Sequence, residues 1–199
     1  MIVPTIVHQI WLQGGKLPPP LDGYVDAVRG LCRQGGWIHW LWDTSDLNGL
    51  SDESRRMFRF LSAGCSDISQ QSNVLRYLIL RDQGGLYLDT DVKLHALPGP
   101  LEGAWVPIAR NMHRAGSFAL ACPSGDPWII RLMELCLQAP LHVRHGAGSK
   151  LVAVSLGPDV KRWEIGDWKD TGSQPAKYGQ HGWMGTQMGH FEMPPVVVC

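Results

Sequence analysis

The sequence predicts an α/β fold in which helices cover a mostly parallel β-sheet. Three observations support this fold class: predicted strands and helices alternate, glycine pairs end several elements, and 44% of the residues are hydrophobic. Alternation favours parallel strands because each helix carries the chain back across the sheet. At 199 residues the chain suits one domain over residues 1–199, which buries enough apolar surface to fold without a disulfide or a metal.

The N-terminal part predicts two strands and two helices in alternation. Its first residues are rich in β-branched and aromatic side chains, which favour a buried strand. Gly14 and Gly15 end that strand, and the three prolines that follow predict a stiff loop. The expected strands cover residues 2–12 and 37–42, and the expected helices cover residues 22–33 and 52–60, the second with Ser51 or Asp52 as its N-cap.

The middle of the chain has the most regular pattern. Apolar residues recur at helical spacing over residues 69–82, and Gly84 with Gly85 stops the predicted helix. Residues 86–92 then predict a strand. Further along, residues 126–137 predict an amphipathic helix with an aspartate at its N-cap and a proline in its first turn.

Composition argues against several classes of protein. The formal net charge is zero, which argues against binding along a nucleic-acid backbone. The five cysteines are odd in number and form no CxxC pair, so neither a disulfide framework nor a zinc ribbon is expected. No apolar run approaches the roughly 20 residues that span a bilayer, and the N-terminus does not resemble a secretion signal. We therefore expect a cytoplasmic protein without a membrane span.

Asp89 and Asp91 are the residues most typical of a chemical site. On an extended strand, residues two apart point to the same side, so their carboxylates would lie together. Neighbouring negative charges repel unless a cation holds them. Mn²⁺ or Mg²⁺ suits such a pair, since these ions take oxygen ligands and complete their shells with water and phosphate. Such an ion offsets the charge that develops on a departing nucleoside diphosphate.

Arg76 lies on the helix that precedes this strand. Helical spacing places Ser72 and Asn73 on the same helix face, opposite part of the apolar stripe. An arginine in this position either contacts sugar hydroxyls or a phosphate, or pairs with Asp89 for structural reasons. The pattern leaves both interpretations open.

The string SNVLRYLILRDQGGLYLDTDV, residues 72–92, resembles the signature of glycosyltransferases with a DXD-containing sugar-binding region. That family includes an initiating α-1,6-mannosyltransferase and the catalytic domains of large clostridial toxins. The string PTIVHQIW, residues 4–11, resembles the opening strand of the same family. Two separate matches in the right order make the resemblance specific. It implies a GT-A-like nucleotide-sugar-binding fold, which is Rossmann-like, with a mixed sheet flanked by helices.

The resemblance also implies an activity and a set of site residues. The implied reaction moves a hexose with retention of configuration from a UDP- or GDP-sugar to a hydroxyl of a carbohydrate or protein acceptor, with Mn²⁺ or Mg²⁺ as cofactor. By position, the implied catalytic residues are Asp89, Asp91 and Arg76, the donor-binding residues are Trp11, Ser72, Asn73, Arg76, Tyr87, Asp89 and Trp183, and the metal ligands are Asp91, Asp89 and His181.

One position departs from the family pattern. Asn73 stands where the family has an aspartate that contacts the sugar, and an amide keeps hydrogen-bonding capacity but lacks the charge. A second hypothesis is therefore a catalytically impaired module that binds a nucleotide sugar or a carbohydrate. A third is a haloacid-dehalogenase-type phosphatase, which the DTD triplet suggests, although no acidic pair follows downstream. Trp11 either stacks on a nucleobase or packs in the core, and His8 is expected to pack.

Overall fold

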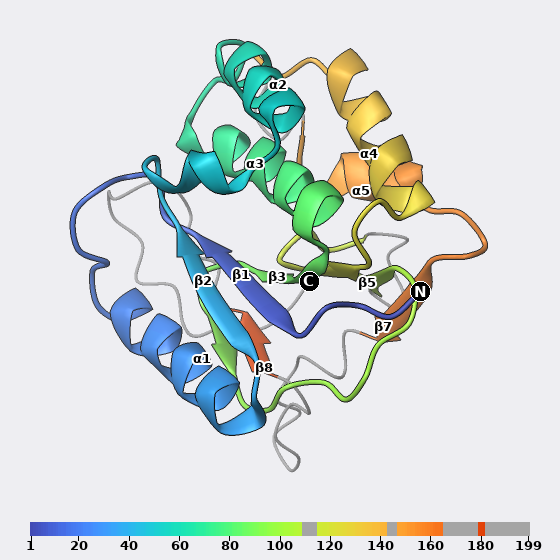
Figure 1. The fold of residues 1–199 in the computed structure, drawn as a ribbon. Helices are drawn as coiled ribbons and strands as arrows, with labels where there is room; N and C mark the ends of the chain where they lie inside the picture. The colour runs from blue at the N-terminus through green and yellow to red at the C-terminus, as the bar shows by residue number, and fades with distance from the viewer. Residues whose placement is uncertain (109–114, 143–146, 165–178, 182–199) are drawn as a thin grey trace.

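The structure, a computed structural model, describes residues 1–108, 115–142, 147–164 and 179–181. A six-stranded sheet with the order β2-β1-β3-β6-β5-β7 forms its centre, and β4 pairs with β8 in a separate two-stranded sheet (Figure 1). The strands are β1 (Ile6–Ile10), β2 (Ile38–Trp42), β3 (Gly85–Leu88), β4 (Val92–Leu94), β5 (Trp105–Ile108), β6 (Ala119–Cys122), β7 (Lys161–Glu164) and β8 (Gly179–His181).

Helices lie on both faces of the large sheet. One hydrophobic cluster joins α1 to the sheet through Val28 and Cys32, and a second joins α3 and α4 to the opposite face. The helices are α1 (Leu21–Gly35), α2 (Asp52–Ser62), α3 (Ile68–Gln83), α4 (Pro127–Gln138) and α5 (Ser149–Ser155), with a 3-10 turn over Asp46–Gly49. This arrangement confirms the predicted α/β fold with a mixed sheet between helices.

The sheet combines a parallel half with an antiparallel half. Strands β2, β1 and β3 run parallel, with His8 of β1 opposite Trp40 on one side and Tyr87 on the other. Strand β6 runs antiparallel to both β3 and β5, while β7 runs parallel to β5. The sheet is therefore less parallel than the alternation of elements suggested. The carboxyl ends of β2, β1 and β3 share one edge, because parallel strands point the same way.

Helix α3 is the central helix of the molecule. Residues 73–80 are all buried, which leaves this stretch no solvent-facing side. The helix packs between the sheet and helices α2 and α4, as Figure 1 shows. The helix face predicted to hold Ser72, Asn73 and Arg76 is therefore largely covered and not open to solvent. Tertiary packing covers that side of the helix, and the polar groups are buried with their partners.

The predicted helix ends agree with the structure. The Ser51 side chain accepts a hydrogen bond from Ser54 N, and the Asp126 side chain accepts one from Trp128 N. Asp67 caps α3 in the same way, through Gln70 N at 2.9 Å. Each cap satisfies a backbone N–H that has no partner within its helix.

Gly84 ends α3 with a left-handed φ of 65°. A Cβ built there would lie 2.5 Å from the backbone nitrogen of Ser124, so only glycine fits. The chain then enters β3 directly. Because the helix stops here, β3 starts beside β1 in the register that the sheet requires.

Two predicted strands differ from the observed ones. The first covers residues 6–10 instead of 2–12, and the strand expected over residues 86–92 divides into β3 and β4. The break falls at residues 89–91, where two aspartates and a threonine meet. Aspartate disfavours strands and favours turns, because its side chain bonds nearby backbone N–H groups.

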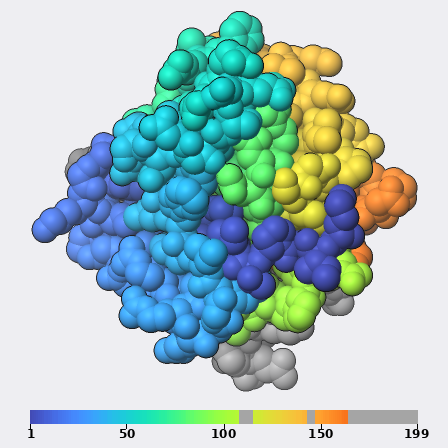
Figure 2. All heavy atoms as spheres, in the orientation of Figure 1, coloured from blue at the N-terminus to red at the C-terminus, as the bar shows by residue number. Residues whose placement is uncertain are grey.

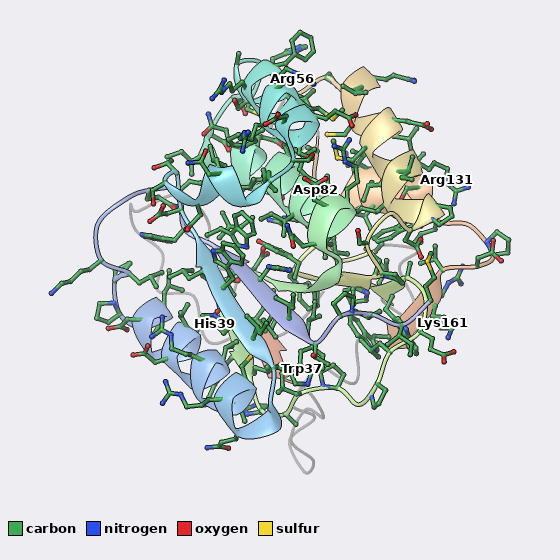
Figure 3. All side chains as sticks on the ribbon, viewed as in Figure 1. Trp37, His39, Arg56, Asp82, Arg131 and Lys161 are labelled. Carbon is green, nitrogen blue, oxygen red and sulfur yellow. The ribbon has the colours of Figure 1, made fainter. Side chains whose placement is uncertain are left out.

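The N-terminal residues lie on the surface of the molecule. The N-terminal residues fill the surface between the segment of α1 and β2 and the segment of α4 (Figure 2). Figure 3 shows His39 between β2 and α1, and Asp82 at the end of α3. Among the described residues, no helix has both the length and the apolar character needed to cross a membrane.

Candidate active site

Strand β1 sends its side chains alternately to the two faces of the sheet. Val7 packs in the cluster that contains α1, whereas Ile10 packs in the cluster that contains α3. By the same alternation, Gln9 and Trp11 lie on the α1 side and His8 lies on the α3 side. His8 is fully buried, with Nε2 3.0 Å from the Gly84 carbonyl and Nδ1 3.0 Å from Trp42 Nε1. Its expected role as a packing residue is confirmed.

Asp89 and Asp91 lie in a turn that joins β3 to β4, which we call the DXD turn (residues 89–92). Val92 N donates to the Asp89 carbonyl at 3.1 Å and closes the turn, and Asp89 N donates to the Phe118 carbonyl at 2.8 Å. The expectation that both aspartates lie on one extended strand is wrong. The turn places them at the carboxyl edge of the parallel strands, beyond the end of β3.

Arg76, Tyr87 and Asp89 form a contiguous cluster. Arg76 Nη2 lies 3.0 Å from Asp89 Oδ1, and the Tyr87 hydroxyl donates to the same oxygen at 2.6 Å. The Arg76 guanidinium also lies over the Tyr87 ring, 4.5 Å from its centroid. Its Nη1 donates to the Ser117 carbonyl at 2.5 Å. The guanidinium therefore holds helix α3, strand β3 and the segment before β6 together.

The electrostatics of this cluster favour a charged arginine and a neutral tyrosine. Burial opposes the charge on Arg76, but Asp89 and the other acidic groups around it outweigh this effect and raise its pKa. Burial raises the pKa of Tyr87 well above its ordinary value, so its hydroxyl stays protonated and donates to Asp89. The Arg76 side chain is only 5% exposed, whereas that of Asp89 is 24% exposed. The Asp89 side chain thus contacts the buried guanidinium and is also partly exposed to solvent.

Ser72 and Asn73 lie one turn before Arg76 on α3. The Ser72 carbonyl accepts from Arg76 Nε at 3.5 Å, and its side chain is half-buried. Asn73 is buried, and its Nδ2 donates to Gln70 Oε1 at 3.5 Å. The same Gln70 oxygen accepts from Ala147 N at 3.1 Å. Asn73 therefore belongs to a buried amide cluster beside the segment that precedes α5.

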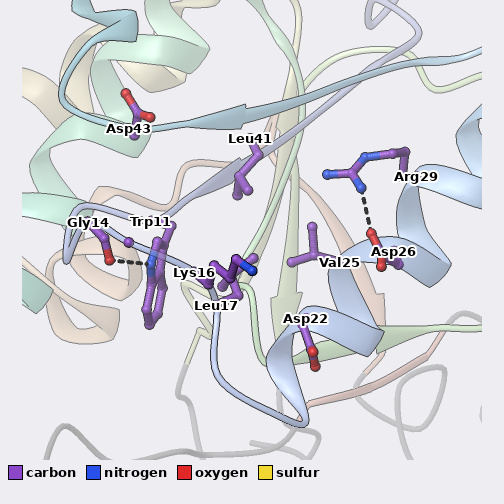
Figure 4. Close-up of a pocket in the computed structure, with 11 residues that line it drawn as sticks. Trp11, Gly14, Lys16, Leu17, Asp22, Val25, Asp26, Arg29, Leu41 and Asp43 are labelled. Carbon is purple, nitrogen blue, oxygen red and sulfur yellow. Dashed lines mark hydrogen bonds and ion pairs between the residues drawn. The ribbon is translucent and has the colours of Figure 1, made fainter.

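A cavity of about 380 Å³ opens next to this edge, on the α1 side of the sheet. Trp11 forms one wall, and its indole Nε1 donates to the Gly14 carbonyl at 3.2 Å (Figure 4). Trp11 is thus a cavity residue rather than a core residue. The remaining wall is formed by Gly14, Gly15, Lys16, Leu17, Asp22, Val25, Asp26, Arg29, Leu41 and Asp43.

The cavity has charged groups on its walls. Asp43 accepts hydrogen bonds from the Ser45 hydroxyl and the Ser45 backbone N–H, which lower the pKa of its carboxyl. Arg29 and Asp26 form an ion pair at 2.5 Å on α1 (Figure 4). Lys16 adds a cation from the loop after β1. The combination of an indole wall with polar groups suits a flat heterocycle with hydrogen-bonding edges.

Of the two site residues predicted near the C-terminus, the structure describes His181 but not Trp183. Strand β8 pairs His181 with Val92, so the backbone of His181 lies beside the residue that follows Asp91. Trp183 lies outside the described residues. Within the described parts of the chain, no three His, Cys, Asp or Glu residues cluster as a metal site. The DXD turn itself contains two carboxylates, those of Asp89 and Asp91.

Sequence inspection did not assign Gln9, His39 or the charged cavity residues to the site. Gln9 Nε2 donates to the Asp89 carbonyl at 3.3 Å, and Gln9 Oε1 lies 2.9 Å from His39 Nε2. Only one signal pointed to Gln9: it lies two residues before Trp11 in the matched first string, so both face the same side of β1. His39 carried no local signal.

Comparison with known proteins identifies a region that contains Arg76 and the DXD turn. Residues 19–101 match the family model described as a glycosyltransferase sugar-binding region containing a DXD motif. An uncharacterised glycosyltransferase of Acanthamoeba polyphaga mimivirus is 30% identical over 93 residues, which cover 46% of this chain and 36% of the relative. The chain thus matches about a third of that relative's length. The resemblance inferred from residues 72–92 is confirmed.

Solved structures share the fold. The PaToxG glycosyltransferase has a TM-score of 0.58 at 17% identity, over 78% of this chain and 69% of that chain. The UDP-bound glycosyltransferase domain from the YGT toxin has a TM-score of 0.53 at 10% identity, over 68% of this chain and 62% of that chain. The fold is therefore that of GT-A glycosyltransferase domains. Nothing in these comparisons favours the phosphatase hypothesis.

Proposed function

We propose that this chain, whose residues 19–101 carry the DXD-containing sugar-binding region of glycosyltransferases, is a metal-dependent retaining hexosyltransferase. It would move a sugar from a UDP- or GDP-sugar to a hydroxyl of a carbohydrate or protein acceptor. One observation carries the proposal: the Arg76–Asp89 pair and the DXD turn lie at the same carboxyl edge as the Trp11 cavity. Ligands of open α/β sheets bind outside the carboxyl ends of the strands.

The base, the diphosphate and the sugar of the donor would lie one after another along this edge. The base and ribose would occupy the cavity, with the base against the indole of Trp11. The diphosphate would lie over the DXD turn, which follows β3 next to β1. The sugar would then reach Arg76 and Asp89, with Ser72 and Asn73 on the helix behind them. The UDP-bound state of the YGT toxin domain supports a nucleotide as a ligand of the shared fold.

The residues present fit a hard divalent cation. The DXD turn offers carboxylate oxygens, and Mn²⁺ or Mg²⁺ binds to few such ligands while keeping water and phosphate oxygens. The carboxylates of Asp89 and Asp91 would hold the ion, and Arg76 and Tyr87 would keep Asp89 in place through Oδ1. His181 is the proposed third ligand, and its backbone pairs with Val92 next to the DXD turn. When bound, the ion offsets negative charge on the leaving diphosphate.

The proposed transfer breaks the bond between the anomeric carbon and the diphosphate oxygen. The acceptor oxygen forms a bond to the same carbon on the same face, and its proton passes to the departing diphosphate. Asp89, which Arg76 and Tyr87 hold in place, orients the sugar hydroxyls while positive charge develops on the ring. Retention of configuration follows from attack on the face that the leaving group vacates.

A second candidate function rests on Asn73. Its amide is buried and bound to Gln70, so this position lacks the negative charge that the family pattern has. A module that binds a nucleotide sugar without transferring it would result if that charge were needed for turnover. The transferase and the impaired module would therefore differ in the rate of sugar transfer but not in their binding of the nucleotide sugar.

The test is release of nucleoside diphosphate from a panel of UDP- and GDP-sugars with Mn²⁺, with and without candidate acceptors. We expect release with one donor, and loss of release after metal chelation or in Asp91→Asn. Binding without release, restored by Asn73→Asp, would instead establish the impaired module. Neither binding nor release with any donor would refute both candidates. Arg56→Ala is the matched control, because Arg56 is exposed on α2, away from the DXD turn.

A further inference from the structure

Gln9 is a fully buried amide that connects β1 to two neighbouring segments. Its Nε2 donates to the Asp89 carbonyl at 3.3 Å, across to the DXD turn. Its Oε1 lies 2.9 Å from His39 Nε2 on β2, which pairs with the other edge of β1. Both ends of the amide are therefore bound, and each end binds a different strand or turn.

The partners define which way the amide points. The Asp89 carbonyl only accepts hydrogen bonds, so the NH₂ group of Gln9 must face it. The oxygen of Gln9 then faces His39, and His39 must carry a proton on Nε2 in order to donate. Burial lowers the pKa of His39 to about 4, which keeps the ring neutral with that single proton.

The carbonyl that Gln9 binds is the one that closes the DXD turn. Val92 N donates to the same Asp89 oxygen at 3.1 Å, so Gln9 and Val92 share this acceptor. The Asp89 N–H is bound to Phe118 on the other side. Gln9 is thus the side chain that ties the turn to β1, whose next outward residue on that face is Trp11.

His39 links the same amide to the wall of the cavity. The charges of Arg29 and Asp26, which line the cavity from α1, act on the His39 ring. Figure 3 shows His39 between β2 and α1, and Figure 4 shows the Arg29–Asp26 pair. Two hydrogen bonds therefore connect His39 through Gln9 to the carbonyl of Asp89, and the charges on the cavity wall act on the His39 end of this series.

We propose that Gln9 is a positioning residue that sets the DXD turn relative to the Trp11 cavity, and that His39 fixes the orientation of the Gln9 amide. The inference rests on the proposed function, because it assigns Gln9 a role in holding diphosphate and metal at the correct distance from the base. Gln9 touches neither ligand. It acts through the backbone of Asp89.

Gln9→Glu and Gln9→Leu distinguish the hydrogen bond from Gln9 to the Asp89 carbonyl from the one between Gln9 and His39. Glutamate is nearly isosteric and still accepts from His39, but its carboxylate has no N–H for the Asp89 carbonyl. Leucine removes both hydrogen bonds. Gln83→Leu is the matched control, since Gln83 Nε2 also donates to a backbone carbonyl, that of Gly49 at 2.9 Å, away from the DXD turn.

Two readouts test the proposal. The first is amide hydrogen exchange at Val92, which we expect to be about fivefold faster in both Gln9 variants than in Gln83→Leu, as expected for one lost hydrogen bond. The second is Mn²⁺ affinity in the presence of UDP or GDP, which we expect to fall about tenfold in the Gln9 variants only. His39→Leu should move both readouts in the same direction by a smaller factor.

The outcomes distinguish this inference from the proposed function. Equal Val92 exchange in Gln9→Glu and Gln83→Leu would overturn the positioning role, whatever the enzyme does. Faster exchange with unchanged Mn²⁺ affinity would also overturn it, because the turn would then not depend on Gln9 for binding. A wild type that binds neither Mn²⁺ nor nucleotide would refute the proposed function, and with it the role assigned to Gln9.

Discussion

Arg76 Nη2 lies 3.0 Å from Asp89 Oδ1, which joins the central helix to the first aspartate of the DXD turn. The pair is only partly shielded, because the Arg76 side chain is 5% exposed and the Asp89 side chain 24% exposed. An ion pair in this position neutralises one carboxylate from inside. The turn therefore presents two carboxylates to the edge without the full repulsion between them.

Replacing Arg76 separates folding from catalysis. Arg76→Ala leaves Asp89 without its buried cation, and we expect a loss of about 2 kcal/mol in the free energy of unfolding, less than for fully buried pairs because Asp89 is partly exposed. Arg76→Lys keeps the charge but cannot bind Asp89 and the Ser117 carbonyl together. It should remain folded in urea titrations yet release nucleoside diphosphate at least tenfold more slowly. Unchanged release in Arg76→Lys would contradict the assignment.

The Tyr87 hydroxyl should matter for the site more than for stability. Tyr87→Phe keeps the ring under Arg76 and removes only the hydrogen bond to Asp89 Oδ1. Tyr77→Phe is the matched control, because the Tyr77 hydroxyl donates to the Ala147 carbonyl at the same distance of 2.6 Å. We expect both variants to lose about 1 kcal/mol of unfolding free energy. Only Tyr87→Phe should require more Mn²⁺ for half-maximal release, and an equal requirement in both would argue against this role.

Trp11 should account for much of the affinity for the nucleotide. Trp11→Leu removes the indole wall of the cavity, and stacking of a base on an aromatic ring contributes about 1–3 kcal/mol. We expect the dissociation constant for UDP or GDP to rise about tenfold or more, measured by calorimetry. Trp105→Leu is the control, since Trp105 stacks on Trp163 and is not part of the cavity wall. If Trp105→Leu weakened binding equally, the base would lie elsewhere.

His8 should make stability depend on pH. Burial lowers its pKa from 6.5 to about 4, and its Nδ1 accepts from Trp42, so the folded state holds the ring neutral. Between these two pKa values the unfolded chain binds a proton that the folded protein does not. The free energy of unfolding is therefore highest above pH 6.5 and falls as the pH decreases towards 4, by about 2 kcal/mol at pH 5.

Urea denaturation at pH 7 and pH 5 measures this loss. His8→Gln keeps a donor and an acceptor but does not titrate, so the difference between the two pH values should be smaller in the variant than in the wild type. His39, whose pKa burial also lowers to about 4, contributes to the remaining slope with the same sign. The same slope in His8→Gln and wild type would show that His8 is not the group responsible.

Local patterns in the chain were sufficient for the four long helices, for the first two strands and for the resemblance to the sugar-binding region. The spacing of apolar residues over 69–82 and the glycine at position 84 predicted α3 and its end to within one or two residues. Ser51 and Asp126 were recognisable as caps because capping depends on a few adjacent residues. The string over residues 72–92 likewise identified the sugar-binding region, because it lies within the family match over residues 19–101.

The sequence alone therefore determined where α1 to α4 form and end, and which residue types are available for chemistry, since each of these depends on near neighbours. Helix α5 (Ser149–Ser155) was not predicted, because the periodicity of apolar residues fades after about residue 140. Only the tertiary structure decided that α3 is buried on every side, that Asp89 and Asp91 occupy a turn, and that the Asp89 carbonyl is bound by Gln9. The burial of α3 and the contact with Gln9 depend on residues far apart in the chain, as in Arg76 with Ser117, 41 positions apart, and Gln9 with Asp89, 80 positions apart. Such contacts leave no periodic trace, because packing satisfies a buried polar group wherever the fold brings a partner.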